Sequence, residues 1–209
     1  TMAGTENKIL IKIGLDLVYI GLVLITFFVN EFSYMESLEI GLIKLSVNYS
    51  GDWFSVLKSE PFSYFKGQFC DSSDDNSQKI CDCLSAWEVS GILYLIFTSI
   101  SFVFCAYGLL RLSLKYLGRD FSLYVKHDIE HYIYPTLYII ALILYTSISQ
   151  VFTLEPPDGL SHDYDVKAEP GIVLMFVALF IVLVSTVYFL IARKEINEKS
   201  DYTRPLLRY

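Results

Sequence analysis

Residues 89–110 read VSGILYLIFTSISFVFCAYGLL and contain no Asp, Glu, Lys or Arg. About 20 apolar residues are what an α-helix needs to cross the roughly 30 Å hydrocarbon core of a bilayer. Residues 132–154 and 171–192 are equally free of charge, and residues 9–29 contain only one lysine and one aspartate. The sequence therefore predicts an all-α membrane protein, a bundle of four transmembrane helices that forms a single tetraspan domain over residues 1–209.

The charges of the connecting segments orient this bundle. Residues 30–88 hold ten acids against four lysines, and residues 155–170 are also acidic. Residues 111–131 and the tail 193–209 carry clustered Lys and Arg, which are retained on the cytoplasmic side during insertion. We therefore expect two outer loops, a cytoplasmic loop and cytoplasmic N- and C-termini, in the plasma membrane or an endomembrane.

The first outer loop, residues 30–88, is patterned like a small antiparallel β-sheet. Residues 38–42 and 43–47 alternate apolar and polar side chains, as half-buried strands do. The alternation slips by one residue beside Gly41, which predicts a β-bulge or bend. Further strands are expected in three short runs, at 52–57, 62–65 and 68–70. An irregular loop with aromatic anchors at the interface is the alternative.

Three of the four cysteines, Cys70, Cys81 and Cys83, lie in this loop. An outer loop is exposed to an oxidising compartment, so a disulfide is expected. Cys81 and Cys83 are poorly placed to bond each other, which leaves Cys70 with either of them. The remaining thiol is free or bonds a partner.

Asn48 begins the tripeptide Asn-Tyr-Ser, which matches the acceptor sequence for N-glycosylation. The tripeptide precedes Gly51 and Asp52, and this cluster of turn-forming residues predicts that Asn48 lies in a turn. We therefore expect Asn48 to be a glycosylation site on the outer side.

Two stretches, residues 40–45 (IGLIKL) and 81–87 (CDCLSAW), resemble motifs of the superfamily of claudins, peripheral myelin proteins and calcium-channel γ-subunits. The first resembles that superfamily's Gly-Leu-Trp strand motif, although Ile43 stands in place of the Trp. The second resembles its second cysteine and the approach to the second span. We take Gly41, Leu42, Trp53 and Trp87 as motif or partner-binding candidates.

The resemblance implies a left-handed four-helix bundle capped by a five-stranded outer sheet, with residues 154–166 supplying the last strand. No cysteine follows the first motif, so the resemblance also implies that the partner of the second cysteine has moved to Cys70. Members of this superfamily build junctions or modulate channels, and the resemblance implies no catalysis and no cofactor.

A catalytic reading rests on His127-Asp-Ile-Glu130-His131, which matches the H-x-x-E-H pattern of some zinc proteases. A zinc site there needs a third protein ligand. The remaining histidine, His162, lies on the opposite side of the membrane in the expected topology. We therefore expect a polar extension of the third span, with no metal.

Asp16 is the one acid within a predicted span. A carboxylate at the centre of a membrane helix costs about 2.5–3.5 kcal/mol on insertion scales. Lys12, four residues earlier, is placed to pair with it on one helix face, and snorkelling to the interface is another solution. Binding of an ion or a partner is the functional alternative.

The patterned outer loop favours a non-enzymatic protein that works by recognition. We expect an accessory subunit of a channel or receptor, or an adhesion component, with other membrane proteins, copies of itself and lipid as partners and no nucleic acid. A homo-oligomeric pore is the second hypothesis and a membrane enzyme the third.

Overall fold

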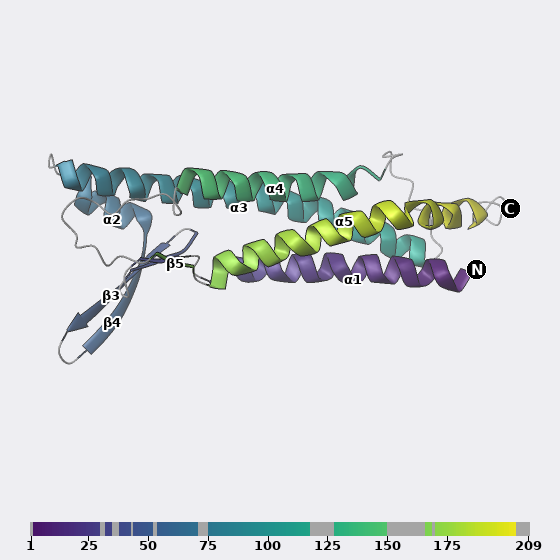
Figure 1. Ribbon diagram of the computed structural model, residues 1–209, viewed down its shortest axis with the longest axis horizontal. Coiled ribbons are helices and arrows are strands. Elements are labelled where there is room, and N and C mark those ends of the chain that lie inside the picture. Colours follow the sequence, from purple (N-terminus) through teal and green to yellow (C-terminus); the bar gives the residue numbers. More distant parts are fainter. Residues whose placement is uncertain are drawn as a thin grey trace. The chain divides into compact units, whose positions relative to one another are not determined.

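A computed structural model describes residues 2–29, 32–34, 38–42, 44–51, 54–70, 75–117, 128–149, 166–168 and 170–203. Figure 1 shows the elements, which follow one another as α1 (Met2–Thr26), β1 (Phe32–Tyr34), β2 (Leu38–Ile40), β3 (Lys44–Gly51), β4 (Phe54–Pro61), α2 (Phe62–Phe69), α3 (Asp75–Tyr116), α4 (Glu130–Ser149), β5 (Val166–Ala168) and α5 (Pro170–Thr203).

Four of the helices, α1, α3, α4 and α5, are long and apolar enough to cross a membrane, which confirms that part of the prediction. Their boundaries have local causes. Pro170 opens α5, where its missing N–H costs nothing, and Glu130 places a negative charge in the first turn of α4, which favours a helix N-terminus.

Helix α3 is longer than a membrane crossing requires. Its 42 residues correspond to about 63 Å at 1.5 Å per residue, roughly twice the thickness of the hydrocarbon core. Residues 75–88, which the sequence placed in the first outer loop, are the first turns of this helix. The apolar run 89–110 is thus only the middle part of the longer helix α3.

The chain divides into two compact units. The helical unit consists of Thr1–Val23, Thr98–Ile139 and Val177–Tyr209. The sheet unit consists of Leu24–Phe97 and Ile140–Phe176. Each of the four long helices contributes one part to each unit.

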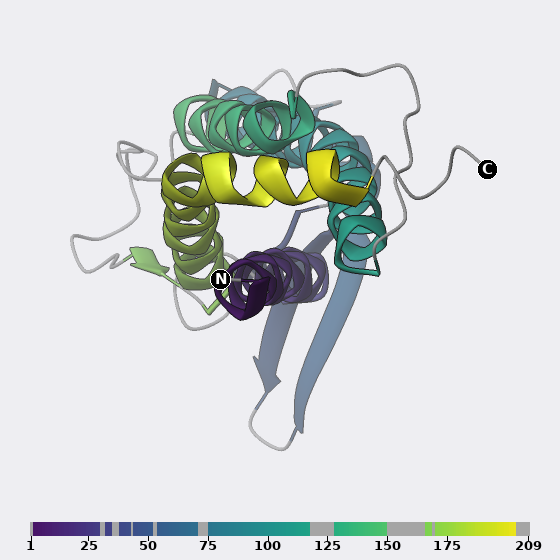
Figure 2. The same ribbon diagram turned by 90° about the vertical axis from the view of Figure 1, so that its right-hand side faces the viewer.

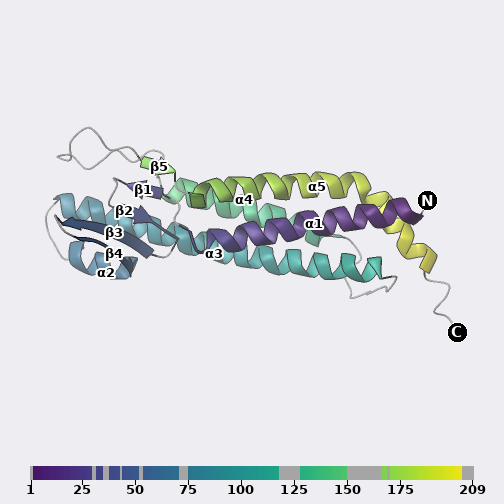
Figure 3. The same ribbon diagram turned by 90° about the horizontal axis from the view of Figure 1, so that it is seen from below.

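The sheet unit contains one five-stranded antiparallel sheet with the strand order β4-β3-β2-β1-β5 (Figure 3). Its longest pairing is the hairpin of β3 and β4, which runs from Lys44 opposite Pro61 to Gly51 opposite Phe54. Strand β1 pairs with β2 on one side and with β5 on the other. Because β5 follows α4 in the chain, the sheet joins the two loops that the sequence placed outside.

Two of the expected strands, residues 62–65 and 68–70, are wrong: the chain there forms α2 and the turn at its end. Phe62 and Phe65 are buried, whereas Ser63 and Tyr64 between them are exposed. Burial at positions i and i+3 is the period of a helix rather than of a strand. Helix α2 packs against β4, the strand that precedes it (Figure 3).

Of the bulge or bend expected beside Gly41, the bend is present: the chain bends at Leu42 between β2 and β3, and the Gly41 N–H donates to the Lys44 carbonyl at 2.9 Å. Two further details differ from expectation. Asn48 lies within β3, opposite Leu57, and not in a turn. Strand β5 shares only Val166 with the expected range 154–166, and residues 150–165 lie outside the described part of the chain.

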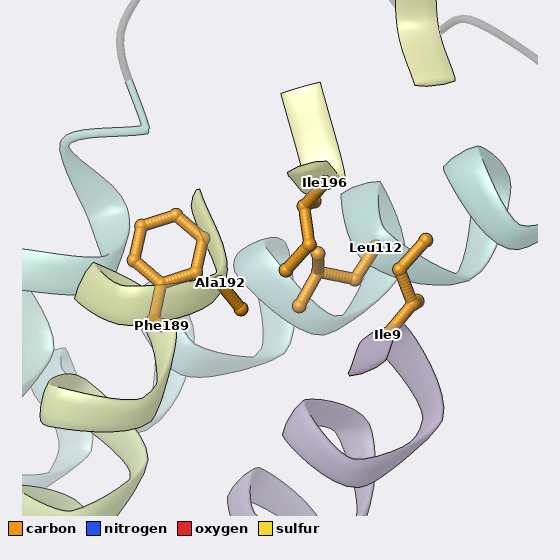
Figure 4. Close-up of a cluster of buried hydrophobic side chains, with 5 residues drawn as sticks. All are labelled: Ile9, Leu112, Phe189, Ala192 and Ile196. Atoms are coloured by element: carbon orange, nitrogen blue, oxygen red, sulfur yellow. The ribbon is translucent and has the colours of Figure 1, made fainter. Parts of the chain in front are cut away.

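In the helical unit, segments of α1, α3, α4 and α5 surround a common interior, which Figure 2 shows end-on. One buried apolar cluster joins three of these helices (Figure 4). It consists of Ile9 on α1, Leu112 on α3, and Phe189, Ala192 and Ile196 on α5. The interior also holds buried polar side chains, among them Lys12, Asp16, Ser101 and Ser185, and these form the candidate site.

Candidate functional site

The centre of the helical unit is an ion pair within α1. Lys12 and Asp16 are both 0% exposed. The Lys12 Nζ atom donates to Asp16 Oδ1 at 2.6 Å and to Oδ2 at 2.7 Å. The predicted i, i+4 pairing is confirmed, but the pair is buried among helices and does not snorkel to an interface.

Two hydroxyl groups complete this pair from other helices. Tyr134 on α4 and Ser185 on α5 each accept a hydrogen bond from Lys12 Nζ at 2.8 Å. Each then donates to Asp16 Oδ1, Tyr134 at 2.8 Å and Ser185 at 2.6 Å. Both hydroxyls therefore bridge the ammonium and the carboxylate, and their proton positions are fixed by the pair.

Aromatic rings line the remaining side of the ammonium group. Lys12 Nζ lies 5.3 Å from the ring centroid of Tyr134 and 5.8 Å from that of Phe189. At these distances the ring faces attract a cation. The charge of Lys12 thus has a carboxylate, two hydroxyls and two rings around it.

A second polar layer continues from Tyr134 to α3. Ser101 donates to the Tyr134 carbonyl at 2.8 Å, and the hydroxyls of Ser101 and Tyr19 are 2.7 Å apart. Because the single Ser101 proton is used on the carbonyl, Tyr19 must be the donor in the second bond. The Tyr19 ring meets the Tyr138 ring edge-on at 5.3 Å. Together the two layers connect α1, α3, α4 and α5.

A cluster of charged side chains lies where α4 begins. Arg111 on α3 donates to Glu130 and lies 3.6 Å from Asp128. Asp128 is also 3.5 Å from Arg193 on α5 and 3.9 Å from Lys115. We call these five residues the Arg111 cluster. Since Asp128 precedes α4 directly, the cluster fixes the start of α4 between α3 and α5.

His131, the candidate zinc ligand of the sequence, packs as a core residue. It is 2% exposed, its ring lies 4.1 Å from the Phe189 ring, and its Cε1 atom would lie 3.0 Å from a Cβ atom added to Gly108. Glu130, the acid of the H-x-x-E-H pattern, pairs with Arg111. His127 lies outside the described residues. Within the described ranges, no group of three His, Cys, Asp or Glu side chains is placed to hold a metal ion.

The sheet unit contains the predicted disulfide, which joins Cys70 at the end of α2 to Cys81 on α3. Of the two pairings left open by the sequence, the one with Cys81 is present, and Cys83 is a free, half-buried thiol. The Lys66 ammonium also pairs with Glu88 on α3 at 2.9 Å. Helix α2 is therefore fastened to α3 by a covalent bond and an ion pair.

Replacing both Cys70 and Cys81 by serine is expected to destabilise the sheet unit by about 3 kcal/mol, because the bond closes a short loop in the unfolded chain. Denaturant titration and limited proteolysis under non-reducing conditions measure the loss. The matched control is Cys83→Ser, which removes a thiol that is not bonded and is expected to change the free energy of unfolding by less than about 0.5 kcal/mol. An equal loss in the control would contradict this pairing.

Leu42, one of the motif candidates, lies against α3, and Gly41, another candidate, precedes it in the bend after β2. Both are buried, and a Cβ atom added to Gly91 of α3 would lie 1.8 Å from the Leu42 carbonyl oxygen. Only glycine, which lacks a Cβ, permits so close an approach of two backbones. Residues 41 and 42 thus have a structural role that the sequence did not reveal.

Trp87, a third motif candidate, is buried between α3 and α4. Trp87 is 8% exposed, and its indole N–H donates to the Ser149 carbonyl at the end of α4 at 3.1 Å. It is thus a buried brace between α3 and α4. Trp53 and the side chain of Asn48 lie outside the described part of the structure.

No protein-family model matches the chain, and no curated protein matches it. The described residues show two chemical features: a disulfide that fastens α2 to α3 beside the sheet, and a helical interior in which Lys12 and Asp16 bond each other.

Proposed function

We propose that this chain is a non-enzymatic multi-pass membrane protein that acts as an accessory subunit of a membrane complex, or in adhesion, through its first outer loop. The observation that carries the proposal is the sheet, which lies against α3 where the Leu42 carbonyl approaches Gly91. Its neighbour α2, which packs against β4, is joined to α3 by the Cys70–Cys81 disulfide. A loop fixed in this way presents a constant surface, and rigid surfaces lose little entropy on binding.

The charge pattern supports the orientation of this surface. Acidic residues dominate the two loops that supply the sheet, and clustered Lys and Arg follow α3 and α5. The sheet then faces the outside, and both termini are cytoplasmic. The five-stranded sheet with a strand from the second loop is also what the claudin-like resemblance implies.

Tyr64 on α2 is a suitable anchor for a partner. It is 41% exposed, next to the buried Phe65 that its ring meets edge-on at 5.4 Å. Tyrosine is enriched at the energetic centres of protein interfaces, where a rigid ring supplies apolar area and a hydroxyl. We place Tyr64 in the partner-binding surface.

Purification from native membranes in a mild detergent tests the proposal. The expected result is a stoichiometric membrane partner whose recovery falls about tenfold or more with Tyr64→Ala, the loss typical of a hot-spot residue. Ser63→Ala, at the neighbouring exposed position, is the matched control and should leave recovery unchanged. A monomer without partner, or equal losses in both variants, would contradict the proposal.

The second candidate is a pore made of several copies of this chain. Many exposed positions of the long helices carry large apolar side chains, which suit contact with other helices as well as with lipid. Reconstitution into vesicles distinguishes the two: a homomeric assembly with measurable conductance favours the pore.

A further inference from the structure

The charged pair of α1 obtains its neutral partners only from helices that are synthesised much later. Tyr134 follows Asp16 by 118 residues, and Ser185 follows it by 169 residues. When α1 first enters the membrane, Tyr134 and Ser185 have not yet been synthesised, so Lys12 and Asp16 lack both hydroxyl partners. In the complete helical unit they are fully buried and bonded to both hydroxyls.

The free energy of α1 in lipid is much less favourable before the hydroxyls arrive than after. Hydrocarbon supplies no hydrogen-bond partner, so every polar group there must be satisfied by protein. An ion pair without its bridging hydroxyls leaves donors and lone pairs unmatched, which disfavours a helix in contact with lipid. Docking of α4 and α5 removes this disadvantage.

We infer that Lys12 and Asp16 form an assembly checkpoint, which makes the stable residence of α1 in the membrane conditional on the docking of α4 and α5. An apolar pair at these positions would hold α1 in the bilayer whether or not the bundle closes. The charged pair holds it only in the closed bundle. Chains that fail to close therefore retain a poorly anchored helix and are removed. The inference rests on the chain spanning the membrane and not on partner binding.

The test uses a substitution that prevents α5 from docking, and compares the resulting half-life of the protein with and without the charged pair. Ala178 on α5 is 0% exposed, so Ala178→Trp overfills the interior and opposes docking. The matched control is Val187→Trp, at a position of the same helix that is 54% exposed. Each is made in the full chain, with the native pair and with Lys12→Met/Asp16→Leu, and the half-life of the protein in cells is measured by pulse-chase.

With the native pair, Ala178→Trp is expected to shorten the half-life about fivefold or more, since failed folding is usually read out as turnover. With the apolar pair, the same substitution is expected to shorten it by less than about twofold. Val187→Trp should leave the half-life unchanged in both backgrounds. Equal shortening by Ala178→Trp in the two backgrounds overturns the inference.

A milder pair of substitutions provides an independent readout. Tyr134→Phe with Ser185→Ala removes both bridging hydroxyls and leaves the charges in place. This change is expected to shorten the half-life several-fold with the native pair and not with the apolar pair. Failure of the apolar-pair chain itself to accumulate overturns the inference, because an apolar α1 should reside in the bilayer more readily.

Discussion

Replacing Gly91 by alanine is expected to destabilise the protein more than the same change at Gly14, Gly21, Gly67 or Gly108. The new Cβ would lie 1.8 Å from the Leu42 carbonyl oxygen and 2.8 Å from its carbonyl carbon. Both are backbone atoms, so no side-chain rotation relieves the overlap. Overpacking typically costs about 1–3 kcal/mol even where neighbouring side chains can adjust. No such adjustment is open here, so we expect the free energy of unfolding to fall by at least about 3 kcal/mol.

The measurement is the amount of folded protein in detergent together with the protease sensitivity of the sheet unit. Two other helical glycines provide graded controls. A Cβ at Gly108 would meet side-chain atoms of His131 and Glu130 at 3.0–3.4 Å, and a Cβ at Gly14 would meet nothing within 4 Å. We expect a moderate loss for Gly108→Ala and none for Gly14→Ala. A harmless Gly91→Ala would contradict the contact with Leu42.

The second large effect concerns the buried pair, and it is expected to depend on whether one charge or both are removed. Lys12→Met leaves the negative charge of Asp16 buried without its partner. Asp16→Leu leaves the positive charge of Lys12 buried without its partner. Removing one partner of a buried ion pair typically costs about 3–5 kcal/mol. The double variant loses both charges and is expected to fall within about 2 kcal/mol of the native chain.

Reversible unfolding of the purified protein in mixed micelles measures this double-mutant cycle. The sum of the two single losses should exceed the loss of the double variant by several kcal/mol, which is the signature of a direct interaction. Lys8→Met is the matched control, because Lys8 pairs with Glu195 at a partly exposed position, where solvent weakens an ion pair and its loss changes stability little. Additive single losses would contradict a coupled pair.

Composition alone was sufficient to predict the spanning helices, because the length and apolarity of a membrane helix are local properties. The error at residues 62–69 has a different origin. The sequence PFSYFKGQF contains apolar residues at spacings of both two and three, and a short run does not distinguish the two periods. Burial of Phe62 and Phe65 with exposure of Tyr64 decides for the helix.

The sequence predicts the ion pair of the polar site but not the two hydroxyls that complete it. Lys12 and Asp16 stand out as the charges of an apolar segment, and their spacing predicts their pairing. Tyr134 and Ser185 carry no such signal, since hydroxyl side chains are common in all four apolar runs. Their role follows only from the packing that brings α4 and α5 against α1. Likewise, nothing local distinguishes Gly91 from Gly14, because the difference lies in what approaches each from another part of the chain.

The bridging hydroxyls have a consequence for the evolution of this chain. Each donates to the carboxylate and accepts from the ammonium, so the four positions 12, 16, 134 and 185 form one hydrogen-bonded ring. A lineage that loses either charge removes the reason for keeping both hydroxyls, and a lineage that loses a hydroxyl comes under pressure to lose the charges. These four positions should therefore be inherited together or replaced together.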